Sequence, residues 1–209
     1  MLRVKICGVT NRADAEEALQ CGADALGFNL WPGSRRHIPL STVTAIATDL
    51  PKSAERVAVM VDPTFAEVLK VIASGCIDSI QLHGHESTDF CRQLRNSGVA
   101  FTKAIAIGTP VFDKLLGDFS TNSMILDTSS DQGFGGSGKT FPWDWARSFV
   151  QSHLELRVWL AGGLTPENVA EAIRVARPHG VDVTTGVERS PGRKDRIRMA
   201  AFVKAARAA

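Results

Sequence analysis

The sequence lacks clustered cysteines, clustered histidines and long hydrophobic runs. Its four cysteines stand far apart, at positions 7, 21, 76 and 91, and no two of them have Cys-x-x-Cys spacing. A disulfide framework and structural zinc are therefore not expected, and we predict no metal site. The longest apolar runs are far shorter than the ~20 residues that a membrane span requires, so we expect no membrane-spanning segment.

An excess of one charge is also missing. The chain holds 24 Lys and Arg against 22 Asp and Glu, a net charge of +2, with both signs mixed throughout. Because there is no long basic run, nothing suggests nucleic acid or a membrane surface as a partner. Met1 stands almost directly before the first apolar run, which leaves no room for a signal peptide. We therefore expect a cytoplasmic protein.

Along the chain, short apolar runs alternate with amphipathic segments. The strand-like runs are 2–7, 24–30, 56–61, 77–82, 99–105, 123–127, 157–161 and 181–184. The helix-like segments are about 11–21, 40–49, 64–74, 87–96, 109–117, 142–152, 165–176 and 194–207. In the seventh helix, Thr165 is the expected cap and Pro166 the expected first helical residue.

The number of these units predicts the fold. Eight units in 209 residues give about 26 residues each, close to the minimum for a closed (β/α)8 barrel. Apolar strands such as Val57–Val61 suit a parallel sheet whose outer face is covered by helices. No linker or shift in composition divides the chain. We predict the α/β class, with residues 1–209 forming a single-domain TIM barrel; the alternative is an open doubly wound sheet with fewer strands.

Reactive side chains stand where predicted strands end, which is where ligands bind in parallel α/β folds. Cys7 ends the first strand, His83 follows the fourth and Asp127 ends the sixth. A carboxylate directly after a buried apolar strand is costly to bury without a purpose or a partner. The structural alternatives are a small buried thiol, a histidine that only makes hydrogen bonds, and an aspartate that serves as a cap or turn residue.

Three loops offer groups that bind anions. After the second strand, Arg35 and Arg36 form either a solvated surface or a fork for a carboxylate or phosphate. The loops after strands 7 and 8 combine closely approaching backbone with hydroxyl groups, as in the phosphate sites of such barrels. The residues predicted to bind phosphate are Gly162, Gly163, Thr185 and Gly186. We therefore expect a small phosphorylated molecule as the substrate.

Residues 133–140, Gly-Phe-Gly-Gly-Ser-Gly-Lys-Thr, match the P-loop pattern. The pattern's mechanism needs a strand that runs straight into the glycines and a helix that opens at Lys-Thr. Here Thr128 to Gln132 separate the strand from the glycines, and Phe141-Pro142 delays the helix. We favour a loop that closes over the barrel mouth, from which Lys139 could reach inward, and keep nucleotide binding as the alternative.

Blocks of residues in order between positions 3 and 195 carry a resemblance. The blocks are Lys5-Ile6-Cys7-Gly8-Val9-Thr10, Gln81-Leu82-His83-Gly84, Leu126-Asp127, residues 135–141, Ala161-Gly162-Gly163-Leu164, and Gly180-Val181-Asp182-Val183 through Gly186-Val187-Glu188. They resemble the phosphoribosylanthranilate isomerase family. The resemblance implies a (β/α)8 barrel of tryptophan biosynthesis that works without a cofactor. The implied reaction is the Amadori rearrangement of N-(5-phosphoribosyl)anthranilate to 1-(2-carboxyphenylamino)-1-deoxyribulose 5-phosphate.

The resemblance also implies roles for individual residues. Cys7 would be the general base that removes the proton from C2 of the ribose, and Asp127 the general acid that protonates the ring oxygen. Arg36 matches the residue that holds the anthranilate carboxylate, and His83 and Lys5 join it as expected substrate-binding residues. A free thiol has a pKa of about 8.5, so Cys7 should need positive charge nearby, and whether Lys5 supplies it is left open.

Some positions depart from the family pattern. Ser34-Arg35-Arg36 stands where the family usually has Ser-Pro-Arg, so the choice between the two arginines stays open. Thr184-Thr185 replaces two serines, and Asp62 stands where Asn is frequent. A histidine-pathway isomerase, expected to have aspartate in place of Cys7, and a non-catalytic barrel remain alternatives. We expect a monomer or a homodimer.

Overall fold

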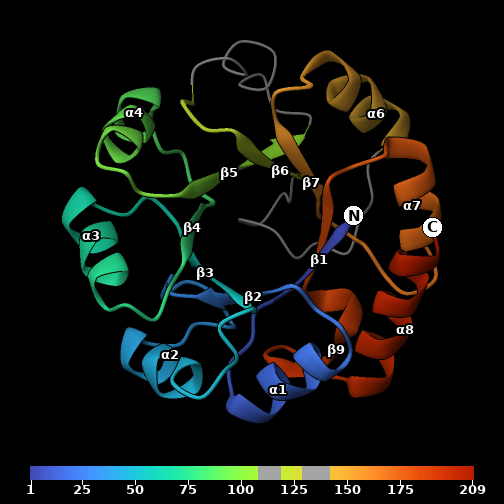
Figure 1. The fold of residues 1–209 in the computed structure, drawn as a ribbon, viewed down its shortest axis with the longest axis horizontal. Helices are drawn as coiled ribbons and strands as arrows, with labels where there is room; N and C mark the ends of the chain where they lie inside the picture. The colour runs from blue at the N-terminus through green and yellow to red at the C-terminus, as the bar shows by residue number, and fades with distance from the viewer. Residues whose placement is uncertain (108–118, 129–141) are drawn as a thin grey trace.

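Eight parallel strands follow one another in chain order around a closed barrel, and the helices form a ring outside it (Figure 1). This computed structural model describes residues 1–107, 119–128 and 142–209. The predicted TIM barrel is confirmed. The helix expected at 109–117 and the glycine-rich loop at 133–140 lie outside the described residues.

The strands lie close to the runs predicted from the sequence. They are β1 Arg3–Cys7, β2 Ala25–Asn29, β3 Glu55–Met60, β4 Ser79–Leu82, β5 Phe101–Ile107, β6 Ser123–Thr128, β7 Arg157–Leu160 and β8 Gly180–Val183. The described helices are α1 Arg12–Gln20, α2 Leu40–Ala47, α3 Phe65–Ala73, α4 Thr88–Asn96, α6 Trp143–Ser152, α7 Val169–Ala176 and α8 Arg196–Ala208.

Alternate residues of each strand face the helices and the barrel interior. On β6, Met124 and Leu126 pack into the large core between strands and helices, whereas Ile125 belongs to a separate cluster with Ala104 and Trp159. Side chains two residues apart in a strand share a face. Asp127 therefore projects to the same side as Ile125, into the barrel.

The strand register brings the predicted site residues to one rim. Cys7 pairs with Gly27 of β2, and Asp127 pairs with Ala106 of β5, each near the carboxyl end of its strand. Since all eight strands are parallel, these ends meet at one mouth of the barrel.

The seventh helix begins later than predicted. Helix α7 starts at Val169 with Asn168 as its cap, and Thr165 and Pro166 lie in a preceding turn. The Asn168 side chain accepts from the Thr165 backbone N–H at 2.8 Å and donates to the Gly163 carbonyl at 3.0 Å. These bonds hold the segment as a turn, so the prediction of a helix from Thr165 was wrong.

A small element after β8 was also not predicted. A 3-10 turn, η1 Thr185–Val187, leads into an antiparallel hairpin of β9 Glu188–Ser190 and β10 Arg193–Lys194. The hairpin turns at Pro191-Gly192, where Gly192 has a φ of 75°. The expected helix from residue 194 therefore starts two residues later, at Arg196, with Asp195 accepting from two backbone N–H groups as its cap.

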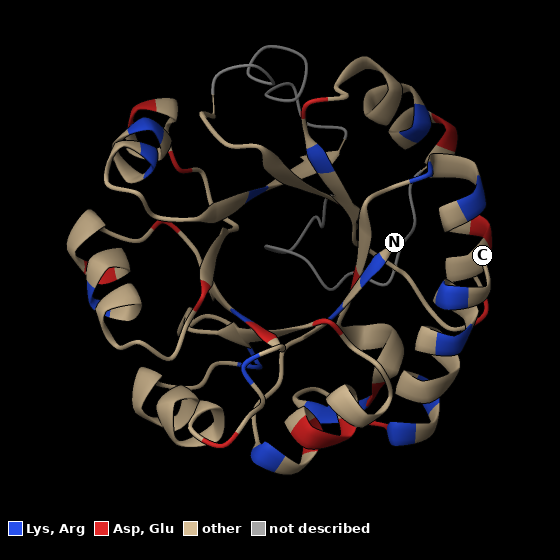
Figure 2. Ribbon diagram, in the orientation of Figure 1, with Lys and Arg blue, Asp and Glu red and all other residues tan. Residues whose placement is uncertain are grey.

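Charged residues of both signs lie on the outer ring: α1 carries both, whereas α8 carries only arginine and lysine (Figure 2). Within the described parts of the chain, no helix combines the length and the apolar character needed to cross a bilayer.

Candidate active site

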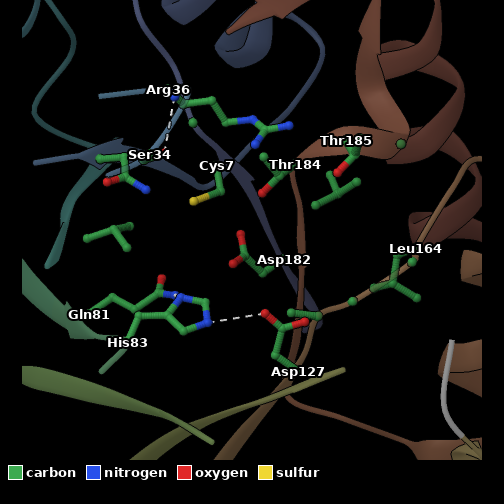
Figure 3. A pocket seen from close by; sticks show the side chains of 18 of the residues that line it. Cys7, Ser34, Arg36, Gln81, His83, Asp127, Leu164, Asp182, Thr184 and Thr185 are labelled. Atoms are coloured by element: carbon green, nitrogen blue, oxygen red, sulfur yellow. Dashed lines mark hydrogen bonds and ion pairs between the residues drawn. The ribbon is translucent and has the colours of Figure 1, made fainter. Parts of the chain in front are cut away.

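A pocket of about 270 Å³ opens at the carboxyl ends of the strands. Its walls include all the predicted site residues except Lys5. They are Cys7, Arg36, His83, Asp127, Gly162, Gly163, Thr185 and Gly186. In Figure 3, the Cys7 thiol and the Asp127 carboxyl project into this pocket from different sides, with the Asp182 carboxyl between them.

Cys7 is the last residue of β1 and is only 7% exposed. Burial raises the pKa of its thiol above the ordinary value, while the positive charges of Lys5 and Lys194 act in the opposite direction. The sulfur lies over Gly27, where a Cβ atom would stand 2.6 Å from Cys7 Sγ and 3.1 Å from Lys5 Cε. The absence of a side chain on β2 therefore makes room for the thiol.

We expect Gly27→Ala to lower kcat, by up to about 10²-fold, because its methyl group must displace the Cys7 sulfur. Steady-state kinetics would measure the loss, and a thermal melt would show that the fold survives. Gly98→Ala, away from the pocket, is the control for general destabilisation: its Cβ atom would meet nothing within 4 Å, but its φ of 73° strains any side chain, so the melting temperature should fall while kcat stays unchanged. Equal kcat in wild type and Gly27→Ala would show that the position of the sulfur does not matter.

Lys5 lies beneath the pocket rather than on its wall, and its predicted contact with the substrate stays a prediction. Its Nζ donates to Gln81 Oε1 at 2.7 Å and to Asp182 Oδ2 at 3.0 Å. Burial alone would lower the pKa of Lys5, but Asp182 and Cys7 raise it above the ordinary value. The sequence left open whether Lys5 supplies positive charge near Cys7. In the structure it does, as a buried ammonium below the thiol.

Asp127 and His83 are in direct contact on the pocket wall. His83 Nε2 lies 3.2 Å from Asp127 Oδ2, and the Thr128 backbone N–H donates to Asp127 Oδ1 at 2.7 Å. Gln81 Oε1 accepts from Lys5, so its amide nitrogen is the group 3.2 Å from His83 Nδ1. In the neutral ring this arrangement puts the proton on Nε2, toward Asp127. The imidazole can therefore donate a hydrogen bond from Nε2 to the Asp127 carboxyl.

Gln81 and Asp182 line the pocket but were not predicted as site residues. Asp182 Oδ1 is buried and has no hydrogen-bond partner among the described residues. Both stand inside apolar strands, at positions whose side chains face the barrel interior with that of Lys5. A polar residue at an inward position of an otherwise apolar strand is the signal that could have identified them.

Arg36 reaches the pocket, whereas Arg35 lies exposed at the surface. The Arg36 guanidinium donates from Nε to Glu188 Oε1 at 2.9 Å and from Nη2 to Glu188 Oε2 at 2.7 Å. These hydrogen bonds raise the pKa of Arg36 above its ordinary value. Glu188, a further residue that was not predicted, thereby fixes the orientation of the fork.

The loops after β7 and β8 touch each other at the far side of the pocket. Gly162 and Gly163 have φ angles of 79° and 63°, in the left-handed region that favours glycine. A Cβ atom at Gly186 would lie 2.0 Å from the Leu164 carbonyl oxygen, so only glycine permits this contact. The two loops present backbone and the Thr185 side chain to the same pocket.

A family model described as N-(5'-phosphoribosyl)anthranilate (PRA) isomerase matches residues 4–205. The chain belongs to this isomerase family. The chain is 39% identical to N-(5'-phosphoribosyl)anthranilate isomerase of Trichlorobacter lovleyi, with both chains fully covered. The predicted family and the isomerase activity in tryptophan biosynthesis are thereby confirmed.

Two solved structures are similar to this isomerase, and each comparison covers the full length of both chains. One is a phosphoribosylanthranilate isomerase in complex with reduced 1-(o-carboxyphenylamino)-1-deoxyribulose 5-phosphate, with a TM-score of 0.87 and 34% identity. The other shows monomers of the dimeric isomerase of Thermotoga maritima, also with a TM-score of 0.87 and 34% identity. Within the described ranges of the isomerase, no three His, Cys, Asp or Glu side chains form a group that could hold a metal ion.

Proposed function

We propose that this pocket rearranges N-(5'-phosphoribosyl)anthranilate to 1-(2-carboxyphenylamino)-1-deoxyribulose 5-phosphate, with Asp127 as general acid and Cys7 as general base. The observation that carries the proposal is that these two groups, from β6 and β1, line the same pocket. A purified-protein assay with freshly generated substrate, followed by fluorescence, tests the overall reaction. Absence of turnover would contradict it.

The chemistry requires an acid and a base on one sugar. Asp127 gives a proton to the ring oxygen, the bond from this oxygen to C1 breaks, and the anilino nitrogen forms an iminium with C1. The iminium acidifies the hydrogen on C2, which the Cys7 thiolate removes to leave an enolamine. Protonation at C1 and loss of the C2 hydroxyl proton then give the ketone. C1 is reduced and C2 oxidised within one molecule, so the balance needs no redox cofactor.

His83 and Lys5 assist the acid and the base. His83 Nε2, 3.2 Å from Asp127 Oδ2, donates a hydrogen bond that orients the carboxyl toward the sugar. The Lys5 ammonium favours the thiolate form of Cys7 against the effect of burial. The hydrogen bonds through Gln81 join Lys5 to His83, so the groups near the base and the acid are held in one network.

The two ends of the substrate carry anions of different shape. A planar carboxylate suits the Arg36 guanidinium, which forms two parallel hydrogen bonds with such groups. A phosphate dianion suits the backbone N–H groups of the loops after β7 and β8, where η1 begins at Thr185. Gly162, Gly163, Thr185 and Gly186 are therefore proposed to bind the phosphate.

We expect Arg36→Ala to raise KM at least about tenfold while kcat changes less, because it removes charge-assisted hydrogen bonds to the carboxylate. Steady-state kinetics with the anthranilate sugar would measure both constants. Arg35→Ala is the matched control and should leave KM unchanged. A rise in KM in Arg35→Ala instead would show that the neighbouring arginine binds the carboxylate.

We further propose a cytoplasmic enzyme in which residues 1–209 form one catalytic domain. The solved structure of a dimeric relative supports the homodimer among the two expected states.

A further inference from the structure

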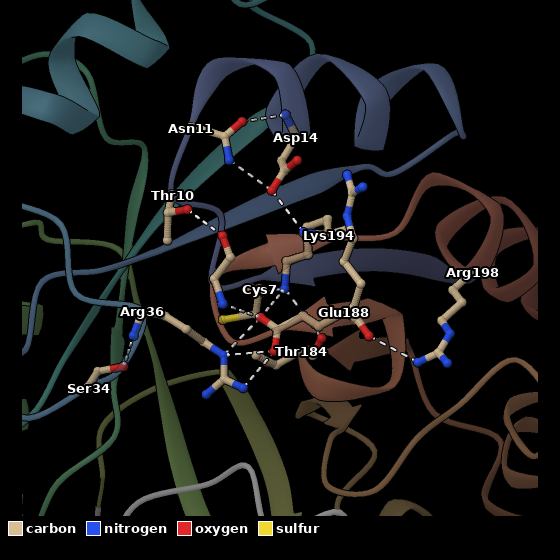
Figure 4. Close-up of polar contacts among 12 residues, drawn as sticks. Cys7, Thr10, Asn11, Asp14, Ser34, Arg36, Thr184, Glu188, Lys194 and Arg198 are labelled. Atoms are coloured by element: carbon tan, nitrogen blue, oxygen red, sulfur yellow. Dashed lines mark hydrogen bonds and ion pairs between the residues drawn. The ribbon is translucent and has the colours of Figure 1, made fainter.

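The β9–β10 hairpin delivers one lysine beneath the active site. Lys194 is 0% exposed, and its Nζ donates to the carbonyl oxygens of Cys7 and Thr184 and to Glu188 Oε1. Three acceptors meet the three N–H groups of an ammonium, so the charged side chain is fully hydrogen-bonded. Two of these acceptors are the carbonyls of Cys7, at the end of β1, and of Thr184, directly after β8, so the lysine links these two strand ends (Figure 4).

Glu188 connects this lysine to the arginine of the pocket. Its carboxylate receives Lys194 Nζ at 3.1 Å and the Arg36 guanidinium at 2.7 Å, and only 2% of its side chain is exposed. Burial alone would raise the pKa of Glu188, but the hydrogen bonds from Arg36 and the charge of Lys194 hold it below the ordinary value. The carboxylate is therefore shared between two cations: Oε1 accepts from both Lys194 and Arg36, and Oε2 accepts from Arg36.

The hairpin is fastened to the start of the chain. The Lys194 backbone N–H donates to Asp14 Oδ2 of α1 at 2.9 Å, and Thr10 Oγ1 donates to the Gly192 carbonyl at 2.6 Å. Asp14 also receives the side-chain amide of Asn11 at 2.9 Å. The hairpin thus has fixed attachments beyond the ion pair, and Lys194 cannot move independently of the loop that follows Cys7.

We infer that Lys194 and Glu188 are positioning residues that join the general base to the carboxylate-binding arginine. Lys194 holds the Cys7 backbone and favours its thiolate, and Glu188 aims the Arg36 fork into the pocket. This inference rests on the proposed roles of Cys7 and Arg36. Neither residue lines the pocket, so Lys194 acts through the Cys7 backbone that it holds and Glu188 through the Arg36 side chain.

A buried ion pair contributes little net stability, because removing two charges from water costs about as much free energy as their attraction returns. Well-packed apolar residues of similar volume often match or exceed the stability of such a pair. An apolar pair here would leave the Cys7 carbonyl without this donor and the Arg36 guanidinium without its partner. Placing the charges beneath the pocket therefore serves the arrangement of the site.

Four charged groups influence the Cys7 thiol, and they come from different elements. They are Lys5 of β1, Asp182 of β8, Lys194 of β10 and Arg36 of the loop after β2. Asp182 opposes the lysines, since its negative charge raises the pKa of the thiol. Removing Lys194 should therefore raise the pKa of Cys7 while the other three groups remain.

The first test is the rate of Cys7 alkylation by iodoacetamide as a function of pH, with the modified peptide identified by mass. We expect Lys194→Met to shift the Cys7 titration upward by about one unit. The matched control is Lys103→Met, since Lys103 is 3% exposed and pairs with Glu86 at 2.8 Å, and it should leave the titration of Cys7 in place. Identical Cys7 titrations in wild type and Lys194→Met would overturn the inference.

This readout needs no turnover, so it stands even if Cys7→Ser shows that the thiol is not the base. If Lys194→Met does not fold, the double variant Lys194→Met, Glu188→Gln replaces it, because it removes the pair rather than one partner. The same upward shift is expected, and its absence would overturn the inference equally.

The second test concerns the hydrogen bonds between Glu188 and Arg36. We expect Glu188→Gln to raise KM about tenfold with a smaller change in kcat, because the fork loses a charged partner that orients it. Glu188→Asp, which keeps the charge, should recover part of the loss. An unchanged KM in Glu188→Gln would show that Arg36 needs no such support.

Discussion

Replacing Asp127 by asparagine should lower kcat by at least ~10²-fold, the typical contribution of a positioned general acid. The amide has nearly the same shape, so the contact with His83 and the bond from the Thr128 N–H can persist. What the amide lacks is an acidic proton for the ring oxygen. Without that proton the furanose does not open, the iminium does not form, and the hydrogen on C2 stays inert.

Rate measurements at saturating substrate would test this, with circular dichroism to show that the barrel is intact. Asp144→Asn, the same change at an exposed carboxylate of α6, should leave kcat unchanged. Turnover by Asp127→Asn at the wild-type rate would remove Asp127 from the mechanism.

Replacing Cys7 by serine should lower kcat by a similar factor, at least ~10²-fold. Serine fits the space over Gly27, but its hydroxyl ionises far less readily than a thiol. The positive charge of Lys5 favours the thiolate of Cys7 and cannot produce a comparable population of alkoxide. Cys21→Ser, at a half-buried thiol away from the pocket, is the matched control.

The pH dependence of the wild type follows from the same thiol. The reactive form of Cys7 is the thiolate, and burial raises the pKa of the thiol above its ordinary value. Because kcat/KM depends on the acid as well as on the base, the thiol is followed alone by the rate at which iodoacetamide alkylates Cys7 in the wild type. We expect this rate to keep rising with pH past the ordinary thiol pKa of about 8.5. A rate that levels off below that pH would contradict the raised pKa of Cys7.

Much of the fold was predictable because one pattern repeats. Apolar strands and capped amphipathic helices alternate along the chain, and the ends of parallel strands must meet at one mouth once the barrel closes. Cys7, His83 and Asp127 could be found in this way because each stands at or just after the end of a strand.

The residues that escaped prediction lie where local sequence carries little information. Asp182 and Gln81 sit within short apolar strands, and their meaning depends on which face points into the barrel. Glu188 and Lys194 belong to a hairpin that packs back under β1, a contact between opposite ends of the chain. The start of α7 was misplaced because the Asn168 side chain binds Thr165 and Gly163, and so overrides the preference of Thr165 and Pro166 for a helix start.

The central claim is that Cys7 and Asp127 act on one sugar from different sides of the pocket. The most direct test is a crystal structure of this isomerase with reduced 1-(o-carboxyphenylamino)-1-deoxyribulose 5-phosphate, the molecule bound in a relative. We expect the Cys7 sulfur against C2 and the Asp127 carboxyl within about 3.2 Å of the oxygen that closes the ring in the substrate. The carboxylate should meet Arg36 and the phosphate the loops after β7 and β8. A ligand that reaches only one of the two groups, or that lies with its ends reversed, would contradict the proposed mechanism.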